Sequence, residues 1–473
     1  MVFSSSLFLL YFLPIFLIVY YLLPRVAKNP FALLASIFFY AWGAPVFVFV
    51  VFGSILLDFY VVRIMNHSGG AKKNWLLAIS MMLNIGLLLY FKYANFFVDN
   101  FNSVLETMGM TAVHWTRVAL PIGISFFTFQ KITYSVDVYR KVHAPLNKVS
   151  DYALYILMFP QLIAGPIVRY NEIADQLVDR RKNENIDNRL TGFFRFVVGL
   201  SKKVLIANVL GEAVDDIFAL GGDNINSLTA WYGIIAYSFQ IYFDFSGYSD
   251  MAIGIGRMIG FRFPENFNNP YISQNISEFW RRWHMTLGRF MKDYLYIPLG
   301  GNRVSTGRMY LNLWVVFLIS GFWHGAAWNF VIWGGFHGIF LIADRIFLLK
   351  IYKAIGKIPS IIITYFIVLI SWVFFRAETL PDAILYLKKM FAFTTEASQF
   401  NFESKFYTIL VVAVFFSFWG GIKAIERWQD KLFAEDQRNR TFILMSVFSI
   451  IFFIISLSAI TSSGFNPFIY FRF

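Results

Sequence analysis

The chain has 473 residues, no cysteine and a formal net charge of +13, and 58% of its residues are hydrophobic while only 15% are charged. This composition excludes an ordinary soluble domain and predicts an all-α membrane protein with several spans. Basic residues in the short connections of such a protein indicate its cytoplasmic side and contact with anionic lipid, so the charge is no reason to expect a nucleic-acid partner. Without cysteine, this chain cannot form disulfides, thiolate metal sites or a cysteine acyl-enzyme.

Apolar runs long enough to cross a bilayer occur along the whole chain. A spanning helix needs about 20 apolar residues, and we expect about 10 to 12 spans, some of them tilted, broken or re-entrant. The runs begin near Leu7, Phe31, Val46, Trp75, Val118, Tyr152, Phe193, Leu228, Leu311, Ala326, Ile361, Thr408 and Phe442.

The first apolar run lacks the basic start and the cleavage site of a secretion signal, so it is predicted to be a retained helix. Because Arg25 and Lys28 follow it directly, the N-terminus is predicted to lie outside the cytoplasm. Two polar stretches, residues 170–192 and 376–406, are predicted to lie outside the membrane. No repeat with a period of about 20 to 50 residues is visible, so a single membrane domain is predicted over residues 1–473.

A third interruption, residues 262–308, has a more informative pattern. Between residues 276 and 297, aromatic and apolar side chains recur at steps of three and four, which predicts an interfacial or re-entrant amphipathic helix. His284 lies at the edge of this helix, and the opposite face is basic. If the helix lies on the cytoplasmic side, its cations suit a phosphate-bearing donor such as a coenzyme A thioester, although periodicity alone favours anchoring to lipid. These cations are Arg281, Arg282, Arg289 and Lys292.

Residues 309–343 contain no Asp, Glu, Lys or Arg, yet they include His324 and His337. One continuous helix of this length would measure about 52 Å, so a break near the glycines is expected. On an unbroken helix the two histidines would lie about 20 Å apart along the axis and roughly 140° apart around it, so they should not share a site unless the chain bends.

A buried, neutral histidine suits a general base that acts on a hydroxyl. His324 is the stronger candidate for this role, whereas His337 is more consistent with packing. No carboxylate lies in the same segment, so a partner must come from elsewhere. The possible partners are His284, Glu278, Asp244 and Asp250.

Eight segments, in the same order along nearly the whole chain, resemble the membrane-bound O-acyltransferase (MBOAT) family. The resemblance is to its bacterial alginate O-acetyltransferase type, to the membrane subunit of peptidoglycan O-acetylation and, more distantly, to the D-alanyl transferase of teichoic acid. The segments are MVFSSSLFLLYFLP at the start, PIGISFFTFQKITYSVDVYR at 121–140, FPQLIAGPIVRY at 159–170, VGLSKKVLIAN at 198–208, YFDFSGYSDMAIGIGRMIGFRFPENFNNPY at 242–271, FWRRWHMTLGRFMKDYLYIPLGGNR at 279–303, SGFWHGAAWNFVIWGGFHG at 320–338 and NPFIYFRF at the end.

The resemblance implies a ring of tilted, partly broken helices around a thinned centre with a tunnel. It implies that His324 is the principal catalytic residue, as a general base or a transient acyl carrier, and that His284 is the second polar residue of the site. The donor expected from this is acetyl-coenzyme A as a substrate, with no permanently bound cofactor and no metal. The basic residues expected on the acyl-CoA side are Arg281, Arg282, Arg289 and Lys292.

The family also implies a multi-pass protein of the bacterial cytoplasmic (inner) membrane. The expected acceptor is a cell-envelope or extracellular polysaccharide, such as an alginate-like polymer or peptidoglycan. The expected partner is a separate periplasmic or extracellular acetyltransferase of the SGNH type, with a Ser-His-Asp hydrolase-like site. Three alternatives remain: D-alanyl or other acyl transfer to teichoic acid-like polymers, proton-coupled transport, and an inactive scaffold subunit.

Overall fold

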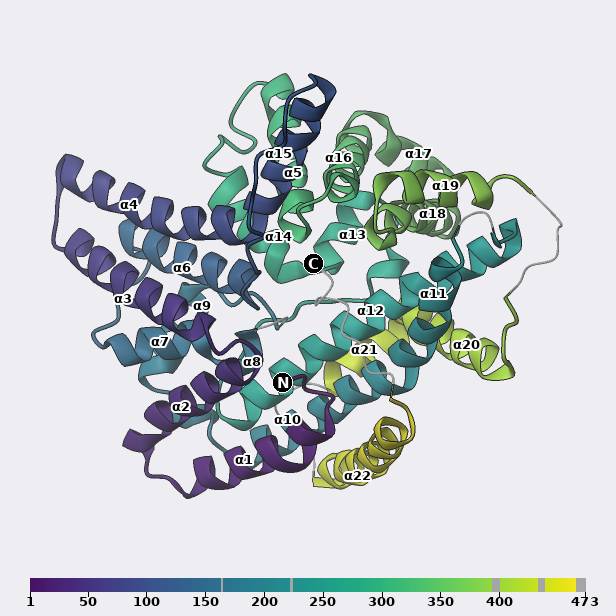
Figure 1. The fold of residues 1–473 in the computed structure, drawn as a ribbon. Helices are drawn as coiled ribbons and strands as arrows, with labels where there is room; N and C mark the ends of the chain where they lie inside the picture. Colours follow the sequence, from purple (N-terminus) through teal and green to yellow (C-terminus); the bar gives the residue numbers. More distant parts are fainter. Residues whose placement is uncertain (163–164, 222–223, 394–399, 433–438, 465–473) are drawn as a thin grey trace. The chain divides into compact units, whose positions relative to one another are not determined.

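The computed structural model describes residues 1–473 except 163–164, 222–223, 394–399, 433–438 and 465–473 (Figure 1). Two of the segments that carry the family resemblance are affected. Segment NPFIYFRF and the two residues 163–164 of FPQLIAGPIVRY lie outside the described residues. Every regular element in the described part of the chain is a helix, as the composition predicts.

The chain forms two compact units, and its prediction as one domain over 1–473 stays a prediction. Unit 1 contains Met1, Leu7–Glu184 and Ile259–Pro264, and unit 2 contains Val2–Ser6, Asn185–Met258 and Glu265–Phe473. The helices of unit 1 are α1 (Leu13–Leu22), α2 (Arg25–Gly43), α3 (Phe47–Asn66), α4 (Gly70–Leu88), α5 (Ala94–Thr107), α6 (Ile124–Tyr139), α7 (Val149–Leu157), α8 (Phe159–Leu162) and α9 (Tyr170–Val178).

Unit 2 contains the remaining α-helices. They are α10 (Ile186–Ser201), α11 (Asn208–Ala219), α12 (Ser227–Met258), α13 (Ile276–Arg282), α14 (Met285–Met291), α15 (Thr306–His324), α16 (Trp328–Ala343), α17 (Leu349–Ile355), α18 (Lys357–Arg376), α19 (Leu380–Met390), α20 (Ser404–Phe418), α21 (Lys423–Leu432) and α22 (Asn439–Ser462).

Within the described residues, six helical runs are long and apolar enough to cross a membrane. Fewer spans are therefore evident than the 10 to 12 expected, because several apolar runs form shorter helices and others, such as α12 with 32 residues and α15 with 19, are long enough but not apolar enough. The run that begins near Val118 gives α6 with 16 residues, and the run that begins near Tyr152 gives α7 with 9 residues. The six runs are Phe47–Asn66, Gly70–Thr107, Trp328–Ile355, Lys357–Arg376, Ser404–Gly421 and Arg440–Ser462.

The amphipathic segment between residues 276 and 297 forms two helices instead of one. Helix α13 ends at Arg282, His284 adopts a left-handed conformation with φ 45°, and α14 begins at Met285. A side chain with a Cβ rarely adopts this conformation, so the surrounding contacts must stabilise it. Whether the segment re-enters the membrane stays a prediction.

The charge-free run 309–343 is broken, as its length predicts. Helix α15 ends at His324 and α16 begins at Trp328. The two helices pack backbone to backbone, because a Cβ at Gly321 would lie 2.3 Å from the Phe330 carbonyl oxygen and one at Gly334 would lie 2.3 Å from that of Phe317. As a result, His324 at the end of α15 and Phe330 in the first turn of α16 both contact the ring of Phe375.

Candidate active site

His324 is buried at the last residue of α15. Its Nδ1 lies 2.7 Å from the carbonyl oxygen of Ser320, one turn earlier in the same helix. A carbonyl oxygen can only accept a hydrogen bond, so Nδ1 carries the proton of the neutral ring. Nε2 is then the basic nitrogen, which is the form that a general base or an acyl carrier requires.

His284 is also buried, between α13 and α14. Its Nδ1 donates to Oδ1 of Asn266 at 3.0 Å, while its Nε2 has no hydrogen-bond partner within the described structure. Burial and, to a smaller extent, the nearby His324 lower the pKa of His284 well below its ordinary value. The imidazole is therefore neutral at neutral pH and carries its lone pair on Nε2.

His337 lies on α16 with no exposed surface, and it has the opposite tautomer. The indole Nε1 of Trp280 is only a donor, and it donates to Nδ1 of His337 at 3.3 Å. The ring proton therefore lies on Nε2, for which the described part of the chain offers no acceptor. A buried N–H without a partner is uncommon, because it gives up its hydrogen bond to water.

Two tryptophans connect these imidazoles, which we call the histidine cluster (His284, His324 and His337). The ring centroid of Trp323 lies 6.4 Å from that of His284 and 4.9 Å from that of His324. The ring centroid of Trp333 lies 5.0 Å from those of His324 and His337.

The bend between α15 and α16 therefore places His324 and His337 against the same ring, that of Trp333. The separation calculated for an unbroken helix does not apply, because the chain bends between the two histidines, as the length of the run predicts. The proximity of His324 and His284 agrees with the pairing that the family resemblance implies. The catalytic roles of all three histidines stay predictions.

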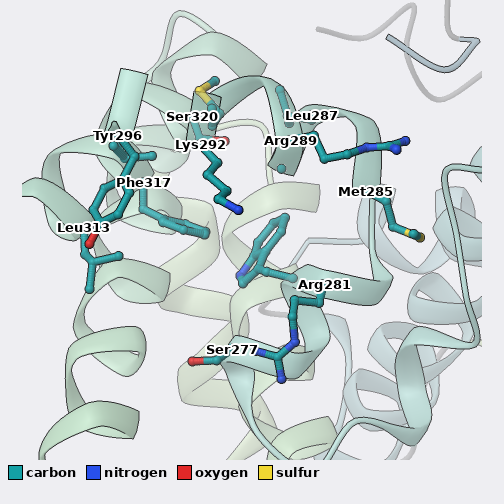
Figure 2. A pocket seen from close by; sticks show the side chains of 14 residues that line it. Ser277, Arg281, Met285, Leu287, Arg289, Lys292, Tyr296, Leu313, Phe317 and Ser320 are labelled. Atoms are coloured by element: carbon teal, nitrogen blue, oxygen red, sulfur yellow. The ribbon is translucent and has the colours of Figure 1, made fainter. Parts of the chain in front are cut away.

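A pocket of about 410 Å³ adjoins the histidine cluster (Figure 2). Its wall includes Trp280, which donates a hydrogen bond to His337, and Ser320, whose carbonyl oxygen accepts a hydrogen bond from His324. Figure 2 shows the side chain of Lys292 extending toward the middle of the pocket. Three of the four cations predicted on the acyl-donor side, Arg281, Arg289 and Lys292, line the pocket.

The fourth predicted cation, Arg282, is not among the lining residues. Its Nε lies 2.9 Å from Oε1 of Glu278, and its Nη1 donates to the carbonyl oxygen of Asn268. This pairing also occupies Glu278, which was one possible partner of His324. The other two carboxylates that were considered are engaged too, since Asp244 pairs with Lys203 at 2.6 Å and Asp250 pairs with Arg195 and Lys202.

Two kinds of site residue were missed from the sequence. Asn266 fixes the imidazole of His284, and Trp280 and Trp333 join the histidines to the pocket. A buried asparagine in NFNNP and tryptophans at helical spacing were visible signals, but neither indicates a partner. In the part of the chain that the structure describes, no group of three or more His, Cys, Asp or Glu side chains could hold a metal ion.

Comparison with known proteins confirms the resemblance seen in the motifs. The model of the MBOAT, membrane-bound O-acyltransferase family, matches residues 103–376, which include the histidine cluster and the pocket. The chain is 43% identical over 405 residues to the probable alginate O-acetylase AlgI of Pseudomonas aeruginosa, covering 85% of this chain and 77% of that protein.

Two further relatives cover most of the chain. The probable alginate O-acetylase AlgI of Pseudomonas putida is 38% identical over 100% of both chains. The peptidoglycan O-acetyltransferase of Helicobacter pylori is 42% identical over 427 residues, covering 82% of this chain and 80% of that protein. The chain therefore belongs to the membrane-bound O-acyltransferase family and is a multi-pass membrane O-acyltransferase.

Proposed function

We propose that this protein takes acetyl from cytoplasmic acetyl-coenzyme A and passes it across the bacterial inner membrane toward a cell-envelope or extracellular polysaccharide. The relatives named as alginate O-acetylases and a peptidoglycan O-acetyltransferase support this substrate class. The observation that carries the proposal is the hydrogen bond from His324 Nδ1 to Ser320, because it makes Nε2 the basic nitrogen and because Ser320 itself lines the pocket that bears the cations.

His324 can drive the transfer by either of two routes. As a general base, its Nε2 takes the proton of an acceptor hydroxyl while the oxygen attacks the thioester carbonyl, the C–S bond breaks, and the leaving thiolate recovers the proton. As an acyl carrier, Nε2 attacks the carbonyl itself, the C–S bond breaks, and the thiolate leaves an acetylimidazolium that keeps its Nδ1 proton. A hydroxyl then takes the acetyl group from Nε2, and its proton goes to the thiolate. Both routes return the neutral ring.

His284 assists through the lone pair on its Nε2, which can accept a hydrogen bond from the acceptor hydroxyl. The cations of the pocket, Arg281, Arg289 and Lys292, bind the phosphates of the donor. The pairing of Arg282 with Glu278 gives it a structural role.

The family arrangement of tilted helices around a thinned centre with a tunnel lets the donor and the acceptor reach His324 from opposite faces. A periplasmic or extracellular partner of the SGNH type would complete the transfer to the polysaccharide. No permanently bound cofactor or metal is needed for either route, since the thioester supplies the activated acyl group.

Labelled acetyl-coenzyme A supplied to inverted membrane vesicles tests this proposal. Vesicles that contain the wild-type protein should move label into an extracytoplasmic acceptor, whereas the His324→Ala variant should not. His67→Ala is the matched control, because His67 is exposed at the end of α3 in the other unit. Equal label transfer by the His324→Ala variant, or transport without thioester consumption, would overturn the proposal.

A further inference from the structure

Asn266 holds the backbone turn and the imidazole of His284 at the same time. Its Oδ1 accepts hydrogen bonds from His284 Nδ1 at 3.0 Å, from the Thr286 backbone N–H at 3.3 Å and from Thr286 Oγ1 at 2.8 Å. Its backbone carbonyl oxygen accepts from the N–H of Met285 at 2.9 Å. Both residues that follow His284 are thus tied to Asn266, which stabilises the left-handed conformation of His284.

The orientation of the Asn266 amide determines which nitrogen of His284 carries the proton. The backbone N–H of Thr286 can only donate, so the atom that faces it must be the amide oxygen. The amide Nδ2 points to Ser249 of α12 and donates to its Oγ at 3.0 Å. Since the oxygen faces the ring, His284 must donate through Nδ1, and its lone pair lies on Nε2.

Asn266 itself is fixed by an ion-pair network that involves the preceding residue. The carboxylate of Glu265 accepts from both terminal nitrogens of Arg195 on α10, each at 2.5 Å. The same guanidinium lies 2.8 Å from the Asp250 carboxylate on α12, next to Ser249. The segment that carries Asn266 is therefore attached to two long helices and can determine the position of a side chain.

We infer that Asn266 is a positioning residue that holds His284 in its Nδ1-protonated tautomer and thereby keeps the lone pair of Nε2 available to the acyl acceptor. This inference rests on the proposed function in one respect, namely that His284 assists His324. A neutral imidazole can carry its proton on either nitrogen, and the partner of one nitrogen decides which tautomer forms. Without Asn266 the two tautomers would mix and the geometry of the turn would loosen.

The other described neighbours of His284 do not determine which of its ring nitrogens carries the proton. Phe245 of α12 packs edge-on against the imidazole at 4.8 Å, and Trp323 of α15 contacts it at 6.4 Å. His324 is the titratable group whose charge affects the pKa of His284. Neither aromatic ring fixes the proton of His284.

The Asn266→Asp variant is the sharpest test, because aspartate keeps the acceptor oxygen and adds a negative charge. The charge favours the imidazolium, so the pKa of His284 should rise. The pH titration profile of the His284 ring nitrogens, followed by ¹⁵N NMR, should then move to higher pH by about 1 to 3 units. A profile that coincides with that of the wild type, in a folded variant, would overturn the inference.

The Asn266→Leu variant removes the acceptor at nearly constant volume. We expect kcat to fall about 10- to 100-fold at unchanged KM, as for other residues that orient a functional histidine. Asn312→Ala is the matched control, since Asn312 is a buried asparagine of unit 2 whose amide donates only to the Leu299 carbonyl oxygen among the bonds described. A kcat for Asn266→Leu within twofold of this control would contradict the proposed role.

Ring-nitrogen NMR of protein labelled with ¹⁵N-histidine tests the tautomer without any activity measurement. The wild type should show His284, assigned by its loss in a His284→Gln variant, as the Nδ1–H form, and Asn266→Leu should show a mixture. An Nε2–H form in the wild type would overturn the inference about Asn266. Absence of acetyl transfer by a wild type that has the expected tautomer would instead overturn the proposed function.

Discussion

Each unit of the molecule has a buried polar cluster, and the two clusters differ in how completely their atoms are hydrogen-bonded. In unit 1, the Asp58 carboxylate of α3 accepts from Ser80 at 2.5 Å, from Asn84 at 3.0 Å and from Tyr152 at 2.5 Å. Buried Lys131 adds electrostatic attraction. In unit 2, by contrast, the Nε2 atoms of His284 and His337 have no partner within the described residues.

This difference separates a structural role from a chemical one. A fully hydrogen-bonded cluster stabilises the packing of the helices that contribute to it, and it offers no open atom to a substrate. A buried nitrogen that lacks a partner costs stability, and in a membrane protein such a polar atom is a candidate for binding a substrate. We therefore expect substitutions around Asp58 to change stability and substitutions in the histidine cluster to change activity.

Asp58→Ala should have the largest effect on stability. It leaves the donors of Ser80, Asn84 and Tyr152 buried without their acceptor, and each group left unsatisfied costs about 1 to 3 kcal/mol. The melting temperature in detergent should fall, while the activity of the protein that remains folded should match that of the wild type. Asp58→Asn is a milder control, because it keeps an acceptor for Ser80. A loss of specific activity in Asp58→Ala without a loss of stability would contradict the structural role of the cluster around Asp58.

His284→Ala should show the opposite pattern. Removing a group that exchanges or accepts the acceptor's proton lowers the rate by about 100-fold or more. The melting temperature should fall less than in Asp58→Ala, because the substitution breaks one bond to Asn266 but also removes a nitrogen that has no partner. Measuring kcat and the melting temperature on the same preparation tests both the predicted loss of activity and the smaller predicted loss of stability. A stability loss as large as that of Asp58→Ala would contradict the distinction between a structural and a chemical cluster.

Arg281→Ala combined with Lys292→Ala should weaken donor binding. Both cations line the pocket, so we expect the KM for acetyl-coenzyme A to rise about 10-fold at low salt, equivalent to about 1.4 kcal/mol. Arg282→Ala is the matched control, because this residue is paired with Glu278. The steady-state KM of the double variant should exceed that of the control. Equal values would show that the pocket does not bind the phosphates.

The pH dependence of stability gives the smallest effect. Since burial lowers the pKa of His284 in the folded state, the unfolded state binds more protons once the pH falls below about 6.5. Stability should therefore decrease with falling pH by up to about 1.4 kcal/mol per unit from this residue. The melting temperature of His284→Gln should fall less between pH 7 and pH 5 than that of the wild type. Identical slopes would show that His284 takes up its proton over the same pH range in the folded protein as in the unfolded chain.

Much of the site was predictable from the sequence, and the rest depended on tertiary contacts. The break near Gly325 followed from helix length, and His284 and His324 followed from the motifs. The proximity of His337 was missed because the bend reverses the chain. Helical periodicity placed Arg282 with the other cations, whereas its contacts with Glu278 and with the Asn268 carbonyl oxygen hold it away from the pocket. Asn266 was missed because its bond to His284 joins two segments that only the fold brings together.

A single-turnover experiment with purified protein tests the central claim most directly. Labelled acetyl-coenzyme A is mixed with reconstituted wild-type protein and a soluble hydroxyl acceptor, and thiol release and acceptor labelling are followed together. We predict that both occur in the wild type and in His67→Ala, and that both fall by about 100- to 10,000-fold in a folded His324→Ala variant. Thiol release and acceptor labelling at the wild-type rate in the His324→Ala variant would contradict the assignment of His324 as the residue that carries the chemistry.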